Sequence, residues 1–294
     1  MSTPEELKNI VKEKYSQIAN QEKGQNAASC CGATDASEEI YNIMTDEYDD
    51  LKGYNPEADL GLGCGLPTQF AQINKGDTVV DLGSGAGNDC FVARHETGAK
   101  GKVIGIDFTI PMIEKARINA EKRQYDNVEF RQGDIEDMPV SDDIADVVIS
   151  NCVLNLVPNK AKVISEIFRI LKPGGHFSIS DIVLKGALPE ALKGDAEMYA
   201  GCVAGAIQKD DYLAEIKNSG FEEISIQKEK SINIPDDLLK KYLNNEAFDE
   251  FRNGETGIYS ITVFAQKPGT TTSKKRKVNI KDLQESCTPG GGCC

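Results

Sequence analysis

The most informative polar motif in the chain is the glycine-rich stretch "DLGSGAGND", residues 81–89, which directly follows the apolar run "TVVDLG". Gly83, Gly85 and Gly87 allow a sharp turn and let the backbone approach a ligand without an intervening Cβ atom. Ligands of open α/β sheets bind at the carboxyl ends of the strands. The motif therefore predicts a ligand-binding loop between a buried strand and a helix.

Two more carboxylates follow the next two apolar runs. Asp107 ends "GKVIGID", and Asp134 ends "NVEFRQGD". A carboxylate in the first position can accept both hydroxyls of a ribose, and one in the second can hold the amino group of an adenine. The GxGxG spacing, rather than GxGxxG, argues against a dinucleotide. Together these residues predict a site for a smaller adenosine-containing cofactor.

Three of the nine cysteines fall in segments expected to cover the mouth of that site. Cys64 lies in "GLGCGLP", Cys152 in "SNCVLNLVP" and Cys202 in "MYAGCVAGA". Three converging thiolates form a soft, trigonal site, which suits pyramidal arsenic(III) and leaves its lone pair free. Simple packing is the alternative for each of the three, most of all for Cys202. Cys90, directly after "GND", is interpreted as a core residue.

Alternating strand and helix patterns position these residues. The chain is expected to form an α/β fold with a doubly wound, mostly parallel, Rossmann-like sheet and helices on both faces. Strands are predicted at 78–83, 101–107, 127–134, 145–150 and 176–184, and helices from about 88, at 111–124 and at 159–171. The run "LKPGG" is expected to end the last of these helices.

The ends of the chain are expected to add smaller elements. Helices are predicted at 3–22, 37–51 and 210–219, a helix or lid at 187–205, and late strands at 222–229 and 257–267, the last of them antiparallel. We divide the chain into a helical arm with a cysteine loop (1–60), a ligand-binding core (61–186), a lid with C-terminal strands (187–266) and a disordered tail (267–294).

The composition of the chain excludes several classes of partner and location. The formal net charge of −14 repels nucleic acids and anionic membranes. No signal-peptide core and no apolar run of about 18 residues are present. We expect a monomeric cytoplasmic protein, whose cysteines in a reducing compartment bind metal or act in catalysis. Its two histidines lie in no recognisable catalytic or metal motif.

Residues 60–185, with the glycine loop, Asp107, Asp134 and "LKPGG" in register, resemble the class I S-adenosylmethionine-dependent methyltransferases. The resemblance implies S-adenosylmethionine as cofactor and no metal cofactor. The glycine loop would face the methionine moiety, Asp107 the ribose, and Asn151 the transferred methyl. The residues that it assigns to the cofactor are Asp81, Gly83, Ser84, Gly85, Asn88, Asp107, Phe108, Met112, Gly133, Asp134, Ile135 and Asn151.

The stretches "GLGCGLP", "DLGSGAGNDC", "SNCVLNLVPNK" and "MYAGCVAGA" narrow the resemblance. Over residues 30–266 they are similar to the arsenite methyltransferase family. This implies that Cys64, Cys152 and Cys202 bind arsenic(III) as arsenite or a thiol conjugate. The arsenic lone pair would attack the sulfonium methyl, so no general base is required. Arsenic detoxification is the corresponding hypothesis for the biological role.

The same resemblance implies a redox step. A further N-terminal cysteine would form a disulfide with Cys64 during turnover, and thioredoxin or glutathione would reduce it. Cys30 and Cys31 are adjacent, and we favour Cys31. The sequence departs from the family at Leu62, where longer members tend to be aromatic, and in its short C-terminal region. These departures concern the redox step and the product distribution.

Two other functions fit parts of the sequence. One is a class I methyltransferase for an organic molecule, such as a quinone precursor or a sterol, which needs an apolar pocket and no thiols. The other is a non-catalytic, thiol-rich protein that binds arsenic or heavy metals through its N-terminal cysteine pair and its tail. The tail carries Cys287, Cys293 and Cys294 and a basic run at 274–277, whose roles the sequence leaves open.

Overall fold

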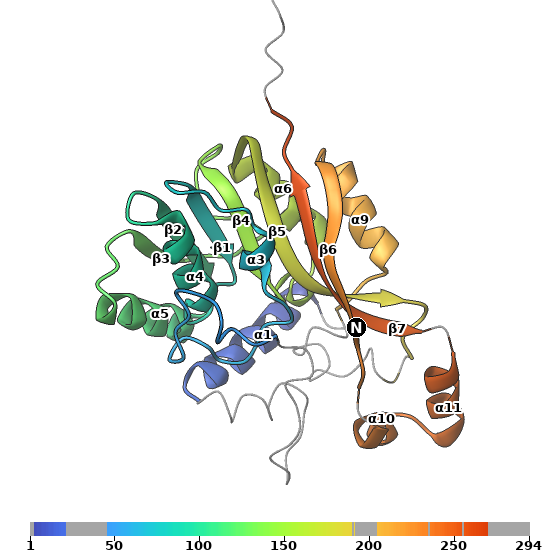
Figure 1. Cartoon of the computed structure of the whole chain (residues 1–294). Helices are drawn as coiled ribbons and strands as arrows, with labels where there is room; N and C mark the ends of the chain where they lie inside the picture. The colour runs from blue at the N-terminus through green and yellow to red at the C-terminus, as the bar shows by residue number, and fades with distance from the viewer. Residues whose placement is uncertain are drawn as a thin grey trace, which may run out of the picture.

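A seven-stranded sheet with the order β3-β2-β1-β4-β5-β7-β6 forms the centre of the molecule (Figure 1). The structure is a computed structural model and describes residues 3–21, 46–189, 191, 205–234, 236–254 and 256–269. Its strands are β1 (Thr78–Leu82), β2 (Lys102–Asp107), β3 (Val128–Gln132), β4 (Ala145–Asn151), β5 (Leu171–Lys185), β6 (Glu222–Ile232) and β7 (Gly257–Gln266).

Strand direction confirms the predicted fold class. β1 pairs in parallel with β2 and β4, β3 pairs in parallel with β2, and β5 in parallel with β4. β7 is antiparallel to both β5 and β6. The central strands are short apolar runs with both faces buried, as expected for a parallel sheet covered by helices on each side.

Helices form a layer on each face of the sheet. One face carries α3 (Pro67–Phe70), α4 (Asn88–Thr97) and α5 (Ile110–Lys122), and the other carries α6 (Lys160–Ile170) and α9 (Lys209–Asn218). Phe91 of α4 and Met112 of α5 pack in the first layer. Ile167 of α6 and Tyr212 of α9 pack in the second. The two layers hold the carboxyl ends of the parallel strands at one edge.

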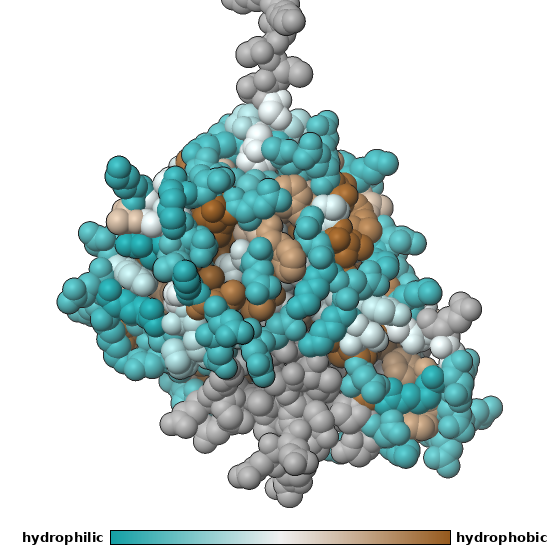
Figure 2. All heavy atoms as spheres, viewed as in Figure 1, coloured by the Kyte–Doolittle hydropathy of each residue, from teal (hydrophilic) through white to brown (hydrophobic). Residues whose placement is uncertain are grey.

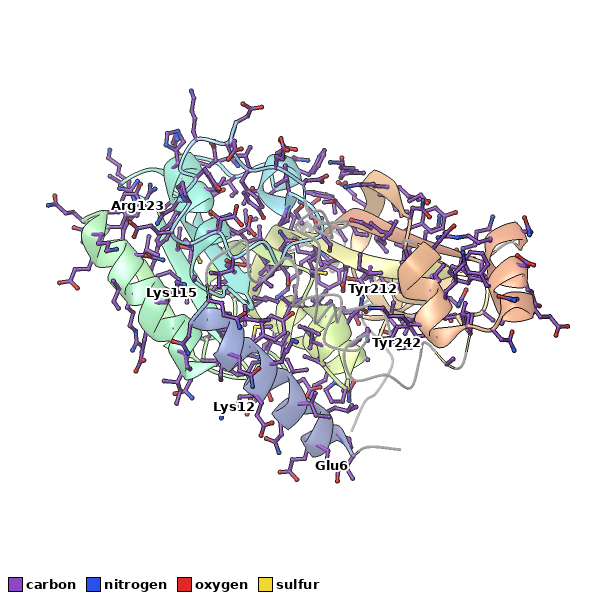
Figure 3. All side chains as sticks on the ribbon, turned by 90° about the horizontal axis from the view of Figure 1, so that it is seen from below. Glu6, Lys12, Lys115, Arg123, Tyr212 and Tyr242 are labelled. Carbon is purple, nitrogen blue, oxygen red and sulfur yellow. The ribbon has the colours of Figure 1, made fainter. Side chains whose placement is uncertain are left out.

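The N-terminal helix α1 (Pro4–Ala19) lies across that edge (Figures 1 and 3). Thr3 and Glu6 form a capping box at its start, and Pro4 occupies its first turn. Val11 and Ile18 are buried, so one side of the helix packs on the sheet edge. Lys115 of α5 donates a hydrogen bond to the carbonyl of Ala19 (3.0 Å). The predicted helix at 3–22 is therefore confirmed.

Some predicted elements differ from the structure. The helix expected at 37–51 is wrong for residues 46–51, which form coil and turn, and the rest of it lies outside the described residues. The turn there is held by short-range backbone hydrogen bonds, such as that from Leu51 N–H to the Tyr48 carbonyl. Most of the predicted lid at 187–205 and of the tail also lies outside the described residues.

Two short helices at the C-terminal side were not predicted from the sequence. They are α10 (Asp236–Tyr242) and α11 (Asn245–Asn253), which lie between β6 and β7. Within the described residues, no helix is long and apolar enough to cross a membrane.

Candidate active site

A cleft opens at the carboxyl ends of β1, β2 and β4. Its walls come from α1, from the segment 58–63, from the glycine loop after β1 and from the residues that follow β2 and β4. All but one of the predicted cofactor residues line it: Asp81, Gly83, Ser84, Gly85, Asn88, Asp107, Phe108, Met112, Asp134, Ile135 and Asn151. The strand ends therefore bring together residues from distant parts of the sequence.

The glycine loop owes its path to backbone conformations that favour glycine. Gly83, Gly85 and Gly87 have φ angles of +65°, +50° and +96°. A Cβ atom on Gly83 would clash with Cγ2 of Val153, so Val153 packs directly against the loop. A Cβ atom on Gly85 would meet only the sulfur of Met112, at 4.0 Å. The backbone at Gly85 thus leaves room for a ligand in the cleft.

Among the buried carboxylates that line the cleft are Asp81, Asp89 and Asp107. Burial raises the pKa of each carboxyl, and the Asp89 charge raises the pKa of Asp81 further. No lysine or arginine in the described parts of the chain forms a salt bridge with any of the three. Because an opposite charge stabilises a carboxylate, the cleft is suited to a ligand with cationic groups.

Three of the residues that line the cleft have a buried side-chain oxygen without a hydrogen-bond partner. These atoms are Ser84 Oγ, Asp89 Oδ1 and Thr109 Oγ1. Most buried polar atoms have a partner, so such exceptions point to a ligand or a bound water. S-adenosylmethionine carries a sulfonium, an ammonium and several hydroxyl and amino groups. The donors and charges of that cofactor therefore match the side chains in the cleft.

Asp107 lies at the end of β2, as predicted. Its Oδ2 accepts a hydrogen bond from Gly85 N–H (3.0 Å) and its Oδ1 accepts one from Thr109 N–H (2.8 Å). These two bonds tie the carboxylate to the glycine loop and to the start of α5. Each carboxylate oxygen keeps a second acceptor position, so binding of the two ribose hydroxyls remains our prediction for this residue.

The adenine-side residues take different positions. Asp134 and Ile135 line the cleft, whereas Gly133 does not. Gly133 donates its N–H to the Asp107 carbonyl (3.0 Å), and Pro139 packs 2.6 Å from where its Cβ would be. Lys8 of α1 forms an ion pair with Asp134 (2.6 Å) and another with Glu136. The predicted adenine-binding carboxylate is thus also a contact of the N-terminal helix.

Asn151, the last residue of β4, lines the cleft, but its amide also binds the Cys64 segment. Its Oδ1 accepts a hydrogen bond from Cys64 N–H (3.0 Å), and its Nδ2 donates to the Gly65 carbonyl (2.8 Å). The prediction that Asn151 faces the transferred methyl stays a prediction.

Cys64 and Cys152 are buried in the same hydrophobic cluster, with Val11 and Leu156. Cys152 also lines the cleft. It has a φ of +61°, which is rare for a residue other than glycine, and its N–H donates to the Ser180 carbonyl (2.8 Å). Such backbone conformations cluster at functional sites, where the surrounding structure holds them.

The other cysteines divide into two groups. Cys90 is fully buried in the layer of α4 and α5, where its thiol donates to Asp81 Oδ2 (3.1 Å), so it is a core residue as predicted. The remaining cysteines lie outside the described residues: Cys30, Cys31, Cys202, Cys287, Cys293 and Cys294. Two of them, Cys31 and Cys202, are predicted site residues. The three-thiolate site is therefore a prediction supported here by two of its members.

Sequence reasoning missed several residues of the cleft. Lys8, Tyr15, Tyr48, Asp59 and Asp89 all line it. Asp89 belongs to the motif and is a buried charge in the first turn of α4, so an acidic residue next to the loop was a usable signal. The others come from α1 and from irregular segments, where no periodic pattern marks a residue that will face a ligand.

Comparison with known proteins identifies the family of this chain. A family model described as a methyltransferase domain matches residues 73–249. The chain is 40% identical over 276 residues to an arsenite methyltransferase of Halobacterium salinarum, an alignment that covers 90% of this chain and 68% of that protein. It is 32% identical over 209 residues to an arsenite methyltransferase of Homo sapiens, covering 66% of this chain and 55% of the human protein.

Among solved structures, the chain is similar to CrArsM, an arsenic(III) S-adenosylmethionine methyltransferase from Chlamydomonas reinhardtii. The TM-score is 0.60 and the identity 35%, with 70% of this chain and 68% of that one covered. Fold, cleft and sequence similarity thus agree over most of the chain. The chain belongs to the arsenite methyltransferase family of the class I, S-adenosylmethionine-dependent methyltransferases.

Proposed function

We propose that this protein transfers methyl groups from S-adenosylmethionine to trivalent arsenic held by the thiolates of Cys64, Cys152 and Cys202. The observation that carries the proposal is the position of the first two. Both are buried in one cluster beside the cleft, and Cys152 is also part of the cleft wall. An acceptor bound by these sulfurs would lie next to the cofactor.

Soft thiolate sulfur is the ligand that suits arsenic(III), and binding drives loss of the thiol protons. Bound S-adenosylmethionine supplies an electrophilic methyl group on a sulfonium. The arsenic lone pair forms the new As–C bond, and the electron pair of the broken S–C bond stays on the cofactor sulfur. No proton leaves the nucleophile, which agrees with the absence of both histidines, His95 and His176, from the cleft wall.

The protein residues of the cleft orient the two reactants. The buried carboxylates Asp81, Asp89 and Asp107 favour the cationic cofactor over a neutral or anionic one. The glycine loop would hold the methionine moiety and Asp107 the ribose, with Phe108 and Met112 beside the adenine. Positioning of this kind contributes most when the reacting atoms are held about 3–3.5 Å apart and aligned.

A redox step completes the proposal. Transfer of a methyl cation raises arsenic formally from the trivalent to the pentavalent state. The thiolate of Cys31 attacks the sulfur of Cys64, and the As–S bond to Cys64 breaks with its electron pair left on the arsenic, which returns to the trivalent state. The methylated arsenic leaves when a thiol of the reductant displaces the thiolates of Cys152 and Cys202. Thioredoxin or glutathione then reduces the disulfide by thiol–disulfide exchange.

The test is a turnover assay with arsenite, S-adenosylmethionine and a thioredoxin system, in which arsenic species are separated by chromatography and detected by mass. Wild-type protein should produce methylated arsenic. Cys64→Ser, Cys152→Ser and Cys202→Ser should each bind arsenite more weakly and lose the product, because a two-thiolate site remains. The cofactor affinity of these variants, measured by calorimetry, should stay close to that of the wild type.

Cys90→Ser is the matched control for arsenic binding, since it removes a buried thiol outside the Cys64–Cys152 cluster. Its arsenite stoichiometry should equal that of the wild type. Cofactor binding without methylated arsenic, under reducing conditions, would overturn the assignment of the acceptor and favour an organic one.

A further inference from the structure

A set of hydrogen-bonded side chains, Tyr48, Asp89 and Asn151, connects the cleft to the segment that carries Cys64; we name it the Asn151 junction. Asn151 Nδ2 donates to Tyr48 Oη (2.6 Å) and lies 3.2 Å from Asp89 Oδ2. Tyr48 Oη in turn donates to Asp89 Oδ2 (2.8 Å). The three side chains come from a loop, from the first turn of α4 and from the end of β4.

Asn151 of the junction and Ser260 of β7 both hold the backbone of the Cys64 segment. The amide of Asn151 accepts from Cys64 N–H and donates to the Gly65 carbonyl, so it binds both polar groups of this stretch of backbone. On the opposite side of the segment, Ser260 Oγ donates to the Cys64 carbonyl. The path of the backbone at Cys64 therefore depends on the orientation of the Asn151 amide.

Two glycines allow this close approach. A Cβ atom on Gly63 would lie 2.6 Å from Asn151 Nδ2, and one on Gly65 would lie 2.6 Å from Ser180 Oγ. Cβ atoms do not approach other atoms so closely, so a larger residue at either position would push the segment away. Two glycines of the motif "GLGCGLP", Gly63 and Gly65, are therefore required by close contact with the junction and with β5.

The two carboxylate oxygens of Asp89 differ in their hydrogen bonds. Its Oδ2 accepts from Tyr48, while its Oδ1 is buried, has no partner, and belongs to a residue that lines the cleft. A buried carboxylate oxygen is costly unless it receives a donor, best of all a cationic one. The ammonium of the methionine moiety is the cationic N–H donor that the cofactor brings into the cleft.

We propose that Asp89 binds the cofactor ammonium through Oδ1, and that Tyr48 and Asn151 are positioning residues that link this contact to the backbone of Cys64. Cofactor binding would then hold the Cys64 segment in place before methyl transfer. The effect on arsenic binding by Cys64 rests on the proposed function. The link between Asp89 and the backbone of Cys64 does not, and it can be measured without arsenic.

The first measurement compares two ligands by calorimetry: S-adenosylhomocysteine and its analogue without the α-amino group. Asp89→Asn should weaken binding of S-adenosylhomocysteine by about tenfold or more, because a hydrogen bond between two charged groups is lost. Affinity for the analogue should change less than threefold. Equal losses for both ligands would overturn the assignment of the ammonium to Asp89.

The second measurement follows alkylation of Cys64 by peptide mass spectrometry, with and without saturating S-adenosylhomocysteine. In the wild type the ligand should slow alkylation of Cys64. Tyr48→Phe removes one hydroxyl of the junction and should abolish at least half of this protection, while ligand affinity falls only a few-fold. Asn151→Ala should abolish the protection entirely.

Tyr125→Phe is the matched control, since Tyr125 is a partly buried tyrosine that packs on Phe91 away from the cleft. It should leave the protection unchanged. Melting curves of each variant separate loss of the link from loss of the fold. If bound S-adenosylhomocysteine still fully protects Cys64 from alkylation in folded Tyr48→Phe and Asn151→Ala proteins, the proposal is wrong.

Discussion

Asp181 on β5 is a fully buried carboxyl outside the cleft. Asn155 Nδ2 donates to its Oδ1 (2.9 Å), as does its neighbour Ile182 N–H (3.0 Å), and Tyr212 Oη lies 3.4 Å from its Oδ2. Burial raises the pKa of Asp181 to about 7, although the positive charge of Lys160 counteracts part of the rise. The protonated form is therefore the one that the fold favours.

This pKa sets the sign of a pH effect on stability. The unfolded carboxyl has a pKa of about 3.9, so the contribution of Asp181 is fully present below about pH 4 and is lost as the pH rises through about 7. Asp181→Asn mimics the neutral acid at every pH. We compare the unfolding free energy of Asp181→Asn with that of the wild type at two pH values. The variant minus wild-type difference should be about 2 kcal/mol larger at pH 8 than at pH 5.

Urea unfolding at the two pH values measures this difference, with Asp50→Asn, at an exposed site, as the control. A wild type and an Asp181→Asn variant whose stabilities change in parallel between pH 5 and pH 8 would show that the buried carboxyl is not protonated.

Gly83 allows a second prediction for a single residue. Gly83→Ala places a Cβ in a left-handed conformation, at a cost of about 1–2 kcal/mol, and also against Val153. It should lower both stability and affinity for S-adenosylhomocysteine. Gly76→Ala is the control, because Gly76 has a φ of +96° but no atom within 4 Å of its Cβ position. Gly76→Ala should lower stability only by the cost of the left-handed backbone conformation, measured as a shift in the unfolding midpoint, and should leave ligand affinity unchanged.

Val153→Ala in the Gly83→Ala background tests the steric part. Partial recovery of ligand affinity is expected because the smaller side chain makes space for the new Cβ. No recovery, or an equal effect of Gly76→Ala on ligand binding, would mean that contact between the loop and Val153 does not shape the cleft.

At the scale of elements, α1 forms one wall of the cleft through Lys8, Val11 and Tyr15. Lys8 fastens the helix to the opposite wall by its ion pairs with Asp134 and Glu136. Lys8 and Asp134 are partly exposed, so their ion pair adds little to overall stability. Glu136 is buried, but it also accepts a hydrogen bond from Asn159 N–H and so keeps a donor without Lys8. The effect of both ion pairs is therefore expected in the local opening of α1.

Lys8→Ala should therefore weaken binding of S-adenosylhomocysteine a few-fold and speed hydrogen exchange in α1, with the global unfolding midpoint nearly unchanged. Lys12→Ala, on the exposed side of the same helix (Figure 3), is the matched control and should change neither quantity. If both substitutions slow or speed exchange equally, the ion pairs do not close the cleft.

For the whole molecule, the net charge of −14 is the dominant feature. The face in Figure 2 is mostly hydrophilic, with hydrophobic residues in separate patches between. Like charges on a compact protein repel each other, and salt screens that repulsion. Raising sodium chloride from low ionic strength to 0.5 M, a span over which the screening length falls several-fold, should raise the melting temperature.

Tetramethylammonium chloride at the same ionic strengths is the control, since it screens charge without a small cation that could bind carboxylates. Both salts should act alike. Stabilisation by sodium alone would indicate site binding, and a fall in melting temperature with both salts would show that attractive ion pairs outweigh the net repulsion.

The sequence by itself determined the parallel part of the fold and the location of the glycine loop at the cleft. Short apolar runs that end at a glycine or an aspartate, such as the run before Gly83 and the run that ends at Asp107, indicate buried strands that end at a polar site. Their order along the chain then leaves few possible topologies. For the same reason, the residues that line the cleft at the strand ends could be predicted, and their contacts with the cofactor stay predictions.

The tertiary structure alone decided which loop and helix residues complete the site. Asn151 and the N–H of Cys64 are 87 positions apart, and Lys8 and Asp134 are 126 apart. Contacts of this kind join irregular segments or the two sides of a cleft, and no local periodicity encodes them. Tyr48 is the clearest case: it belongs to no helix or strand, and it becomes part of the site only when the packed sheet brings Asp89 and Asn151 to its hydroxyl.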